Sequence, residues 1–362
     1  MILAAGFGER MRPLTEARAK PSLPTLNRPM IVHTLEYLRR HQIREVMINL
    51  HHEPESIRGV VGDGSRLGLR VHYSEEPVLL GTAGGPKKVE EFFADQGSFI
   101  LINSDFITDC DLEAVVKKHR EADALATLVL TPPRPDTDYG VVEMGDRERI
   151  QRIAGRPQAD PDPHAGRYTF TGLHVLEPTV LRDIPAGEKV EINRTVYPRL
   201  ISEGKTIRGF VHSGLWRELG TPRLYIEGSI AVLRAGRDPS LAPLRVSEGV
   251  YLDRASMPRN ATLDPPVLLG RGATVGSESQ LIGGAVIGRQ VRIGKGCMLT
   301  QTIVWDGARI GDRARLTDCI VTSGVYVPPD AVLQNKIVLR VEGYQGPKDR
   351  LERLGSNWVS SF

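Results

Sequence analysis

The sequence predicts an α/β protein whose first two-thirds form a doubly wound, mostly parallel sheet and whose last third forms a short β-solenoid. Strand-like apolar runs alternate with amphipathic helix-like runs as far as residue 235, which is typical of parallel sheets. The hydrophobic period then changes to six, which neither a helix nor a hairpin produces. A glycine turn followed by basic residues comes directly after the first strand, and this order is typical of a phosphate-binding loop.

The elements follow one another regularly in the first two-thirds of the chain. We expect strands at 2–5, 46–50, 69–73, 99–102 and 124–130, and helices at 30–41, 86–93, 112–121 and 224–234. The first helix places Ile31, Leu35 and Leu38 on one face. Because strands and helices alternate, we expect the binding loops at the strand ends. A stretch rich in proline, arginine and serine follows and predicts loose structure to about residue 266.

The last third carries a six-residue repeat of aliphatic residues, several of them followed directly by glycine. The repeated residues are Leu269, Val275, Leu281, Ile287, Ile293 and Leu299 and, after a one-residue slip, Val304, Ile310 and Leu316. Such a repeat predicts roughly three stacked coils, with each repeat forming one side of a coil. Because open ends expose strand edges, we expect the preceding domain or a neighbouring subunit to cap them. The predicted division is 1–235 for the α/β domain, 236–266 for a linker, 267–330 for the solenoid and 331–362 for a tail.

Composition excludes several classes of protein. A net charge of +3 without charged blocks does not indicate binding to nucleic acid or membrane. The three cysteines lie far apart, so we expect neither a disulfide framework nor a metal cluster, and a reducing cytoplasm fits. No run approaches the roughly 20 apolar residues of a membrane span, and no signal peptide is expected. The first strand is short, so we expect the native start to lie a few residues upstream.

The loop after the first strand is the most informative motif. Gly6 and Gly8 allow the backbone to approach an anion closely, Arg10 can fork onto phosphate oxygens, and Lys20 adds a point charge. A dinucleotide fingerprint would need a third glycine where this chain has Met11, and the Gly-Lys-Ser/Thr of a P-loop is absent. The alternative is an ordinary strand-to-helix turn with solvated arginines.

The string from residue 2 to residue 21 resembles the signature of the sugar-1-phosphate nucleotidylyltransferases. The resemblance covers about residues 1–235, and the solenoid matches the C-terminal part of such proteins. It implies a Rossmann-like nucleotidyltransferase fold followed by a left-handed parallel β-helix of the hexapeptide-repeat kind. It also implies that Arg10 and Lys20 are catalytic and that the nucleotide binds to Leu3, Ala4, Ala5, Gly6 and Gly8.

Two further motifs extend this resemblance to the base and the metal. The segment 75–85 resembles the loop that reads the base, which implies contacts from Glu76, Gly81, Thr82, Ala83 and Gly84; a flexible turn is the alternative. Asp105 follows an apolar strand, and Trp216–Pro222 resembles a family segment whose acid is a second metal ligand. The resemblance therefore implies that Asp105 and Glu218 bind Mg²⁺. This chain departs from the family at Ser104, where glycine is usual, and at Glu218, where aspartate is usual; Asp105 could instead cap the next helix.

The resemblance also implies contacts to the sugar phosphate. The segment from Tyr139 to Glu143 resembles the sugar loop, and Gly155-Arg156-Pro157 stands where the family often has Glu-Lys-Pro. The residues implied are Gly140, Arg156, Thr171, Gly172 and Asn193. For each of them, a purely structural turn is the alternative.

The implied activity is the transfer of a nucleotidyl group from a nucleoside triphosphate to a sugar 1-phosphate. The Glu-Pro…Leu-Gly-Thr-Ala-Gly segment looks most like mannose-1-phosphate guanylyltransferases, which favours GTP and mannose 1-phosphate. A uridylyl- or thymidylyltransferase acting on a glucose or amino-sugar 1-phosphate is the alternative, and a non-catalytic subunit that senses nucleotide sugars is another. Acyl transfer by the solenoid is disfavoured because its usual histidine base is absent after His212. We expect a cytoplasmic homo-oligomer that assembles through the β-helix.

Overall fold

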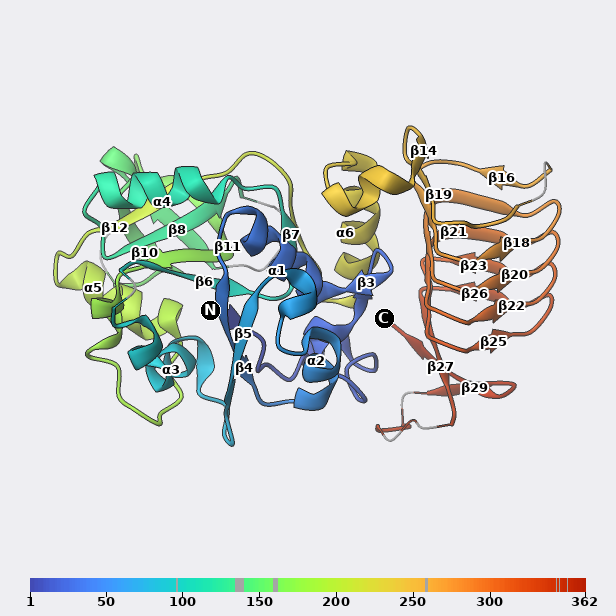
Figure 1. Cartoon of the computed structure of the whole chain (residues 1–362), viewed down its shortest axis with the longest axis horizontal. Helices are drawn as coiled ribbons and strands as arrows, with labels where there is room; N and C mark the ends of the chain where they lie inside the picture. The colour runs from blue at the N-terminus through green and yellow to red at the C-terminus, as the bar shows by residue number, and fades with distance from the viewer. Residues whose placement is uncertain are drawn as a thin grey trace. The chain divides into compact units, whose positions relative to one another are not determined.

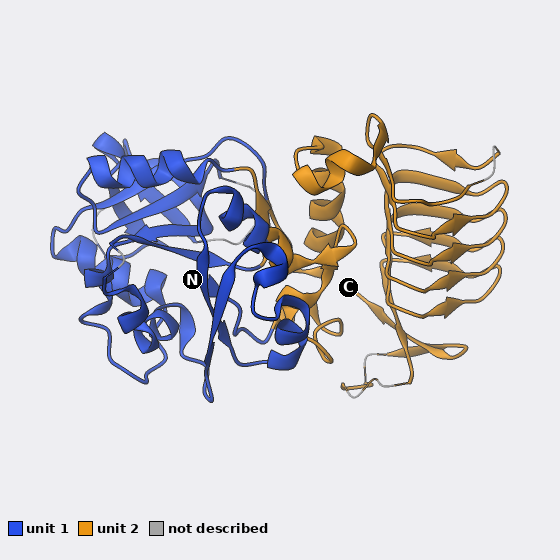
Figure 2. Cartoon of the chain, in the orientation of Figure 1, with its two compact units in different colours: residues 1–7, 34–104, 110–216 blue, residues 8–33, 105–109, 217–362 orange. Residues whose placement is uncertain are grey.

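The computed structural model describes residues 1–95, 97–133, 140–158, 162–257, 260–342, 344, 346–349 and 351–362. The chain forms two compact units, whose courses are shown in Figures 1 and 2. The first unit contains residues 1–7, 34–104 and 110–216, and the second contains residues 8–33, 105–109 and 217–362. The described residues include no helix with the length and apolar character needed to cross a membrane.

The first unit is built on a mixed sheet with the strand order β10-β9-β11-β6-β1-β4-β5, to which β8 and β12 are added beyond β11. Parallel pairs join β1 to β4 and β6, β4 to β5, and β12 to β8, whereas β11 is antiparallel to its neighbours. The strands are β1 (Ile2–Leu3), β4 (Glu45–Leu50), β5 (Arg70–Glu75), β6 (Phe99–Asn103), β8 (Ala126–Thr131), β9 (Val141–Met144), β10 (Ile150–Ile153), β11 (Gly166–Leu176) and β12 (Ile207–Val211). The predicted fold class is confirmed, and the antiparallel β11 is the addition that the sequence did not predict.

Helices connect these strands. They are α1 (Met30–Arg40), whose first turn belongs to the second unit, α2 (Pro54–Val61), α3 (Gly81–Lys88), α4 (Leu112–Glu121) and α5 (Tyr197–Ser202), with short helical turns at η3 (Ser65–Leu67), η4 (Glu90–Phe93), η5 (Asp146–Glu148), η6 (Pro178–Leu181) and η7 (Ile192–Val196). α4 has its predicted bounds because Asp111 caps it, accepting hydrogen bonds from the N–H groups of Glu113 and Ala114. The predicted apolar face of α1 is buried, since Ile31, Leu35 and Leu38 are almost fully covered.

The second unit begins with the basic loop and ends with the solenoid. Before the solenoid it contains η1 (Glu9–Met11), η2 (Lys20–Ser22), the hairpin β2 (Pro24–Thr25) and β3 (Arg28–Pro29), β7 (Phe106–Thr108), β13 (Trp216–Glu218), whose first residue belongs to the first unit, α6 (Pro222–Ala235) and η8 (Pro239–Leu244). β13 pairs with β7, and α6 packs on β19 and β21 of the solenoid.

The solenoid strands are β14 (Arg245–Ser247), β15 (Val250–Leu252), β16 (Thr262–Leu263), β17 (Val267–Leu269), β18 (Thr274–Val275), β19 (Gln280–Ile287), β20 (Arg292–Ile293), β21 (Met298–Val304), β22 (Arg309–Ile310), β23 (Arg315–Thr317), β24 (Ile320–Val321), β25 (Tyr326–Val327), β26 (Val332–Gln334) and β27 (Lys336–Arg340), with β28 (Glu352–Leu354) and β29 (Asn357–Ser361) after them. Leu269 pairs in parallel with Ile287, and Ile287 with Val304, so three six-residue repeats make one coil, as the pattern predicts. Glycine follows the aliphatic residue because the corners stack closely: a Cβ at Gly270 would lie 2.7 Å from the backbone of Gly288.

Two parts of the C-terminal region differ from the predicted loose linker at 236–266 and tail at 331–362. β15 pairs in parallel with β17, so the stretch predicted as irregular already contains a rung of the sheet. At the other end, β26 and β27 continue the parallel ladders, and β29 adds an antiparallel strand beside β27. The six-residue repeat is not visible in these segments because proline and charged residues interrupt it. Their backbones nevertheless form hydrogen bonds with the neighbouring coil and so extend the ladders.

Candidate active site

Two ion pairs form the centre of the candidate active site, and all four side chains belong to the second unit. Lys20 Nζ lies 2.6 Å from Asp105 Oδ2, and Arg10 Nη2 lies 3.0 Å from Glu218 Oε1. The backbone N–H of Leu219 donates to the carbonyl of Asp105 at 2.8 Å, beside the pairing of β13 with β7. These two short strands thus bring the two predicted metal-binding acids together, and the basic loop supplies both cations.

The two acids have different electrostatic environments. Burial opposes the ionisation of Asp105, but the charge and hydrogen bond of Lys20, together with the charge of Arg10, outweigh it and hold the pKa of Asp105 below its usual range. Burial, and then the negative charge of Asp105, raise the pKa of Glu218 above its ordinary value against the opposing effect of the two cations. A divalent cation would stabilise two carboxylates that repel one another in this way.

The residues present fit a divalent cation as a partial site. Glu218 Oε2 is buried and has no hydrogen-bond partner among the described residues, so its lone pairs are available to a ligand. Within the described ranges, no three His, Cys, Asp or Glu side chains form a group that could hold a metal. Mg²⁺ is commonly bound by one or two carboxylates, with substrate phosphates and water completing its shell. Asp105 and Glu218 match that arrangement.

Gly220 lies directly against the Arg10–Glu218 pair. A Cβ added at Gly220 would lie 2.2 Å from Glu218 Oε1 and 2.9 Å from Arg10 Nη2, so any side chain here would displace the pair. The next residue, Thr221, caps α6 by accepting a hydrogen bond from the N–H of Leu224 at 3.2 Å. Residues 216–222 therefore end β13, place Gly220 against the Arg10–Glu218 pair and begin α6.

In the first unit, Asn49 and Glu76 link β1 to the predicted base-reading segment. The N–H of Ala4 donates to Asn49 Oδ1 at 2.8 Å, and Asn49 Nδ2 donates to Glu76 Oε1 at 2.7 Å. Glu76 Oε2 accepts from the N–H of Leu80 at 2.9 Å. Both carboxylate oxygens of Glu76 thus accept hydrogen bonds from protein groups. The contact of Glu76 with a base stays a prediction. Of the other residues predicted to bind nucleotide here, Leu3 and Gly8 are half-buried, Ala4 and Ala5 are buried, and Gly6 is exposed.

The prediction of a loop at 75–85 followed by a helix at 86–93 was wrong in its boundaries. α3 begins at Gly81 and ends at Lys88, and a separate turn follows. Its glycines satisfy packing, because a Cβ at Gly84 would lie 2.4 Å from the carbonyl oxygen of Glu188. Close packing overrides the low helix propensity of glycine, and the role of Gly81, Thr82, Ala83 and Gly84 toward a base stays a prediction.

Glu191 makes a polar contact with the predicted base-reading segment that the sequence did not predict. Thr82 Oγ1 donates to Glu191 Oε2 at 2.8 Å, and the N–H of Ile192 donates to Thr82 Oγ1 at 2.8 Å. Asn193, two residues further on, has a buried Oδ1 without a hydrogen-bond partner among the described residues. The signal in the sequence is that an acid and an amide, Glu191 and Asn193, stand on either side of the apolar Ile192.

The remaining predicted sugar contacts fall into two places. Thr171 and Gly172 lie where β11 loses its register with β8; Thr171 Oγ1 donates to the carbonyl of Val129 at 2.7 Å, and Trp216 Nε1 donates to the carbonyl of Thr171 at 3.0 Å. Gly140 and Arg156 instead flank the hairpin of β9 and β10. Tyr139 lies outside the described residues. The joint role of these two groups toward a sugar phosphate stays a prediction.

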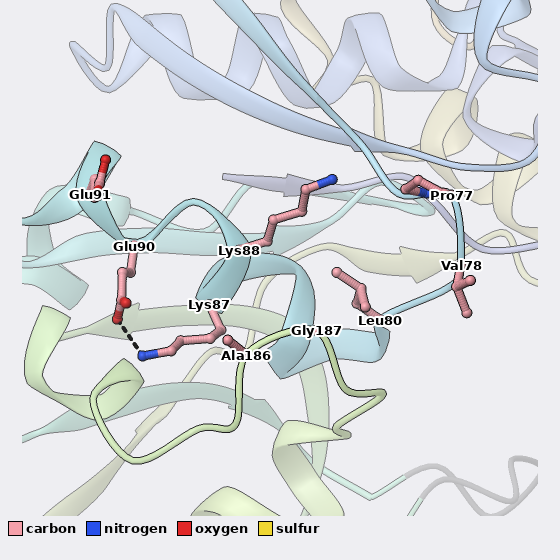
Figure 3. Close-up of a pocket in the computed structure, with 9 residues that line it drawn as sticks. All are labelled: Pro77, Val78, Leu80, Lys87, Lys88, Glu90, Glu91, Ala186 and Gly187. Atoms are coloured by element: carbon pink, nitrogen blue, oxygen red, sulfur yellow. Dashed lines mark hydrogen bonds and ion pairs between the residues drawn. The ribbon is translucent and has the colours of Figure 1, made fainter.

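A cavity of about 580 Å³ lies beside α3 in the first unit (Figure 3). Lys87 Nζ pairs with Glu90 Oε2 at 2.7 Å along its wall. Its lining is Pro77, Val78, Leu80, Lys87, Lys88, Glu90, Glu91, Ala186 and Gly187. Pro77, Val78 and Leu80 belong to the predicted base-reading segment 75–85, whereas the residues predicted one by one to bind nucleotide or sugar do not line this cavity.

Comparison with known proteins shows the family to which this chain belongs. Residues 1–235 match the protein family described as "Nucleotidyl transferase", and residues 248–348 match the one described as "EIF2B subunit epsilon LbH domain". The chain belongs to the nucleotidyl transferase family. This membership confirms the family, the fold class and the class of enzyme predicted from the sequence. Enzymes of this family typically use a divalent metal, in keeping with the paired carboxylates.

Curated relatives and a solved structure extend the match over most of the chain. The chain is 33% identical over 311 residues to a mannose-1-phosphate guanylyltransferase of Mycobacterium tuberculosis, covering 86% of this chain and 80% of that protein. It is 31% identical over 337 residues to a UTP–glucose-1-phosphate uridylyltransferase of Synechocystis sp., covering 89% and 86% respectively. A putative glucose-1-phosphate thymidylyltransferase from Bacillus anthracis, solved in complex with a sucrose, has a TM-score of 0.55 and 23% identity, covering 64% of this chain and 93% of that chain. That likeness shows the fold alone.

Proposed function

We propose that the protein transfers a guanylyl group from GTP to mannose 1-phosphate, forming GDP-mannose and pyrophosphate. The observation that carries the transferase assignment is the pair of contacts Lys20–Asp105 and Arg10–Glu218, which gathers two cations and two carboxylates in one place. The choice of guanine and mannose is supported by relatives that are named mannose-1-phosphate guanylyltransferases.

The reaction needs positioning and charge neutralisation more than a protein nucleophile. An oxygen of the sugar phosphate forms a bond to the α-phosphorus of GTP, the bond from that phosphorus to the pyrophosphate oxygen breaks, and pyrophosphate leaves with the electron pair. Arg10, whose side chain is 61% exposed, would fork onto the leaving pyrophosphate. Lys20 would neutralise the phosphate under attack. A divalent cation, in our proposal Mg²⁺ held by Asp105 and Glu218, would supply further charge neutralisation to the phosphate oxygens.

The binding residues complete the proposal. The triphosphate would lie along the backbone of Leu3, Ala4, Ala5, Gly6 and Gly8, and the base against Glu76 and the segment from Gly81 to Gly84. The sugar phosphate would contact Gly140, Arg156, Thr171, Gly172 and Asn193, and the position of Glu191 beside Thr82 adds it to this group. The buried, unpartnered oxygen of Asn193 supports a polar ligand there.

Three broader assignments belong to the same proposal. We propose that the chain works in the cytoplasm, which the three free, buried cysteines support. We propose a homo-oligomer formed through the solenoid, supported by the exposed Val332 in the last described strand of one ladder. We propose a division into residues 1–235, 236–266, 267–330 and 331–362, in which β15, β26 and β27 extend the parallel ladders of the solenoid into the second and fourth segments.

A uridylyltransferase acting on glucose 1-phosphate is the second candidate, because the Synechocystis relative carries that name. The deciding experiment supplies GTP and UTP at equal concentration with Mg²⁺ and a panel of sugar 1-phosphates, and measures pyrophosphate and the nucleotide sugars formed. We expect GDP-mannose to dominate. If a UDP-sugar dominates, the guanylyl assignment is wrong, and if no pair releases pyrophosphate, the transferase assignment is wrong.

A further inference from the structure

The hairpin that follows Lys20 is attached to the solenoid. β2 and β3 are joined by the two-residue turn Leu26-Asn27, in which both residues have positive φ, at 50° and 63°. Asn27 Nδ2 donates to the carbonyl of Ile287, within a solenoid coil, at 2.8 Å. Leu26 is a bulky residue in this conformation and is 3% exposed, so tertiary packing holds the turn in place.

A second attachment runs through two buried aromatic side chains. Trp305, directly after β21, donates from Nε1 to the hydroxyl oxygen of Tyr225 on α6 at 3.1 Å. The Tyr225 hydroxyl in turn donates to the carbonyl of Pro24 in β2. Trp305 is 6% exposed and Tyr225 is fully buried, so water cannot readily replace these bonds. The indole, the phenol and the hairpin carbonyl therefore form one directed chain of hydrogen bonds.

A third contact lies on the other side of Lys20. The guanidinium carbon of Arg18 is 5.7 Å from the centre of the Trp305 ring, within the range of a cation–π interaction. Trp305 thus contacts the chain before Lys20 directly and the chain after it through Tyr225. Residues 8–33 and 217–362 belong to the same compact unit, shown in one colour in Figure 2.

Lys20 itself is held between these attachments. It begins the short turn η2, in which the N–H of Leu23 donates to the carbonyl of Lys20 at 3.0 Å. Its side chain is only 11% exposed and its Nζ is directed to Asp105 at 2.6 Å. A buried lysine in one rotamer can reach a phosphate correctly only if its backbone is correctly placed. Residues on both sides of Lys20 therefore contact the solenoid, directly or through Tyr225.

We propose that the solenoid positions Lys20 for phosphoryl chemistry through Trp305, Tyr225 and Asn27, which are positioning residues for the transferase reaction. The C-terminal domain then serves turnover as well as the assembly expected from the sequence. The inference rests on the proposed function only for the role of Lys20 in turnover, since the attachment of the loop is independent of which sugar or base is used.

The test compares the full-length variants Trp305→Phe and Trp358→Phe. Trp305→Phe removes the indole N–H and leaves the Tyr225 hydroxyl without its donor. Trp358 is a matched control, because its Nε1 has no hydrogen-bond partner among the described residues and its ring contacts are Arg353 and Lys348. We expect Trp305→Phe to lower kcat by about tenfold with little change in KM for the sugar phosphate, as for small misplacements of a catalytic group. We expect Trp358→Phe to leave kcat unchanged.

A double-mutant cycle separates positioning from general destabilisation. In a Lys20→Ala background, Trp305→Phe should cause no further loss of kcat, because the group that it positions is gone. Asn27→Gly offers a second, independent variant, since glycine keeps the positive φ while losing the bond to Ile287. Additive losses in the cycle, or normal kcat in both Trp305→Phe and Asn27→Gly, would overturn the proposal.

Hydrogen–deuterium exchange gives a readout that does not need turnover. Residues 18–27 should exchange faster in Trp305→Phe than in the wild type or in Trp358→Phe, while the α/β sheet keeps its protection. Unchanged exchange at 18–27 would refute the attachment. If exchange rises as expected but no substrate pair yields pyrophosphate even in the wild type, the proposed function has failed and the attachment stands.

Discussion

Asp105→Asn should remove most of the turnover while leaving the fold intact. Asp105 lies at the point where the apolar strand β6 ends, and it contacts Lys20 at 2.6 Å in a setting where the two side chains are 23% and 11% exposed. Asparagine has nearly the same shape and can still accept the hydrogen bond from Lys20 through its amide oxygen. The substitution therefore isolates the negative charge of Asp105 from its size.

The expected effects of Asp105→Asn are a loss of stability and a loss of turnover, which are estimated separately. For stability, a hydrogen bond to a charged group is worth about 1.5–3 kcal/mol, and part of it is kept by the amide, so unfolding free energy should fall by about 1–2 kcal/mol. For turnover, a divalent cation stabilises the transition state by several kcal/mol, and a neutral ligand would hold it poorly. A loss of about 4 kcal/mol corresponds to a decrease of about a thousandfold in kcat.

The assay is pyrophosphate release across a range of Mg²⁺ concentrations, together with a thermal melt of each variant. Asp109→Asn is the matched control, because Asp109 lies on the same short segment, is 25% exposed and pairs with Arg237 at 2.8 Å. We expect the control to keep kcat within about twofold of the wild type. Folded Asp105→Asn protein with activity equal to that of the control would refute a metal-binding role for Asp105.

Three other predictions test neighbouring parts of the molecule. Gly220→Ala should lower kcat by about tenfold or more, because a Cβ there would lie 2.2 Å from Glu218 Oε1; initial rates of the folded variant check this, and normal rates would contradict it. Lys20→Ala should lower kcat rather than only raise KM, because charge builds on the phosphates during transfer; steady-state kinetics that show a pure KM effect would reduce Lys20 to an anchor. Burial opposes ionisation of Asp238, but its bonds to His33 outweigh this and hold its pKa below the usual range. Asp238→Asn should therefore lower Tm near neutral pH, with the difference from wild type shrinking as the pH falls below about 4; a difference that persists in melts at low pH would disprove the charge effect.

The parts of the fold that the sequence predicted are those with strong local patterns. The six-residue repeat identified the solenoid because each Leu269-type position must face the same narrow core, and the structure buries Leu269 and Ile287 completely. α4 was predicted to its end residues because an aspartate cap, an apolar face and a basic last turn agree. Such local patterns can be interpreted without knowing which residues lie far away in the sequence but close in the fold.

The parts that were missed depend on distant partners. The glycines of α3 indicate a loop when read alone, and only contact with the segment around Glu188 explains why they stand in a helix. The antiparallel β11 has no feature that distinguishes it from a parallel strand, because direction is set by its connections. Glu191 becomes a candidate site residue only when Thr82, far away in sequence, is placed beside it.

Glu218 shows how a departure from a family pattern is accommodated by its surroundings. The family usually has aspartate at this position, and glutamate is longer by one methylene group, so the same backbone would carry its carboxylate further into the site. In this structure the extra length is accepted by the space at Gly220, whose missing Cβ leaves room for Oε1, and Arg10 then fixes that oxygen at 3.0 Å. The other oxygen remains buried and without a partner among the described residues. Because one oxygen is held and the other is left open, the longer acid keeps a free carboxylate oxygen of the kind that a metal ligand needs.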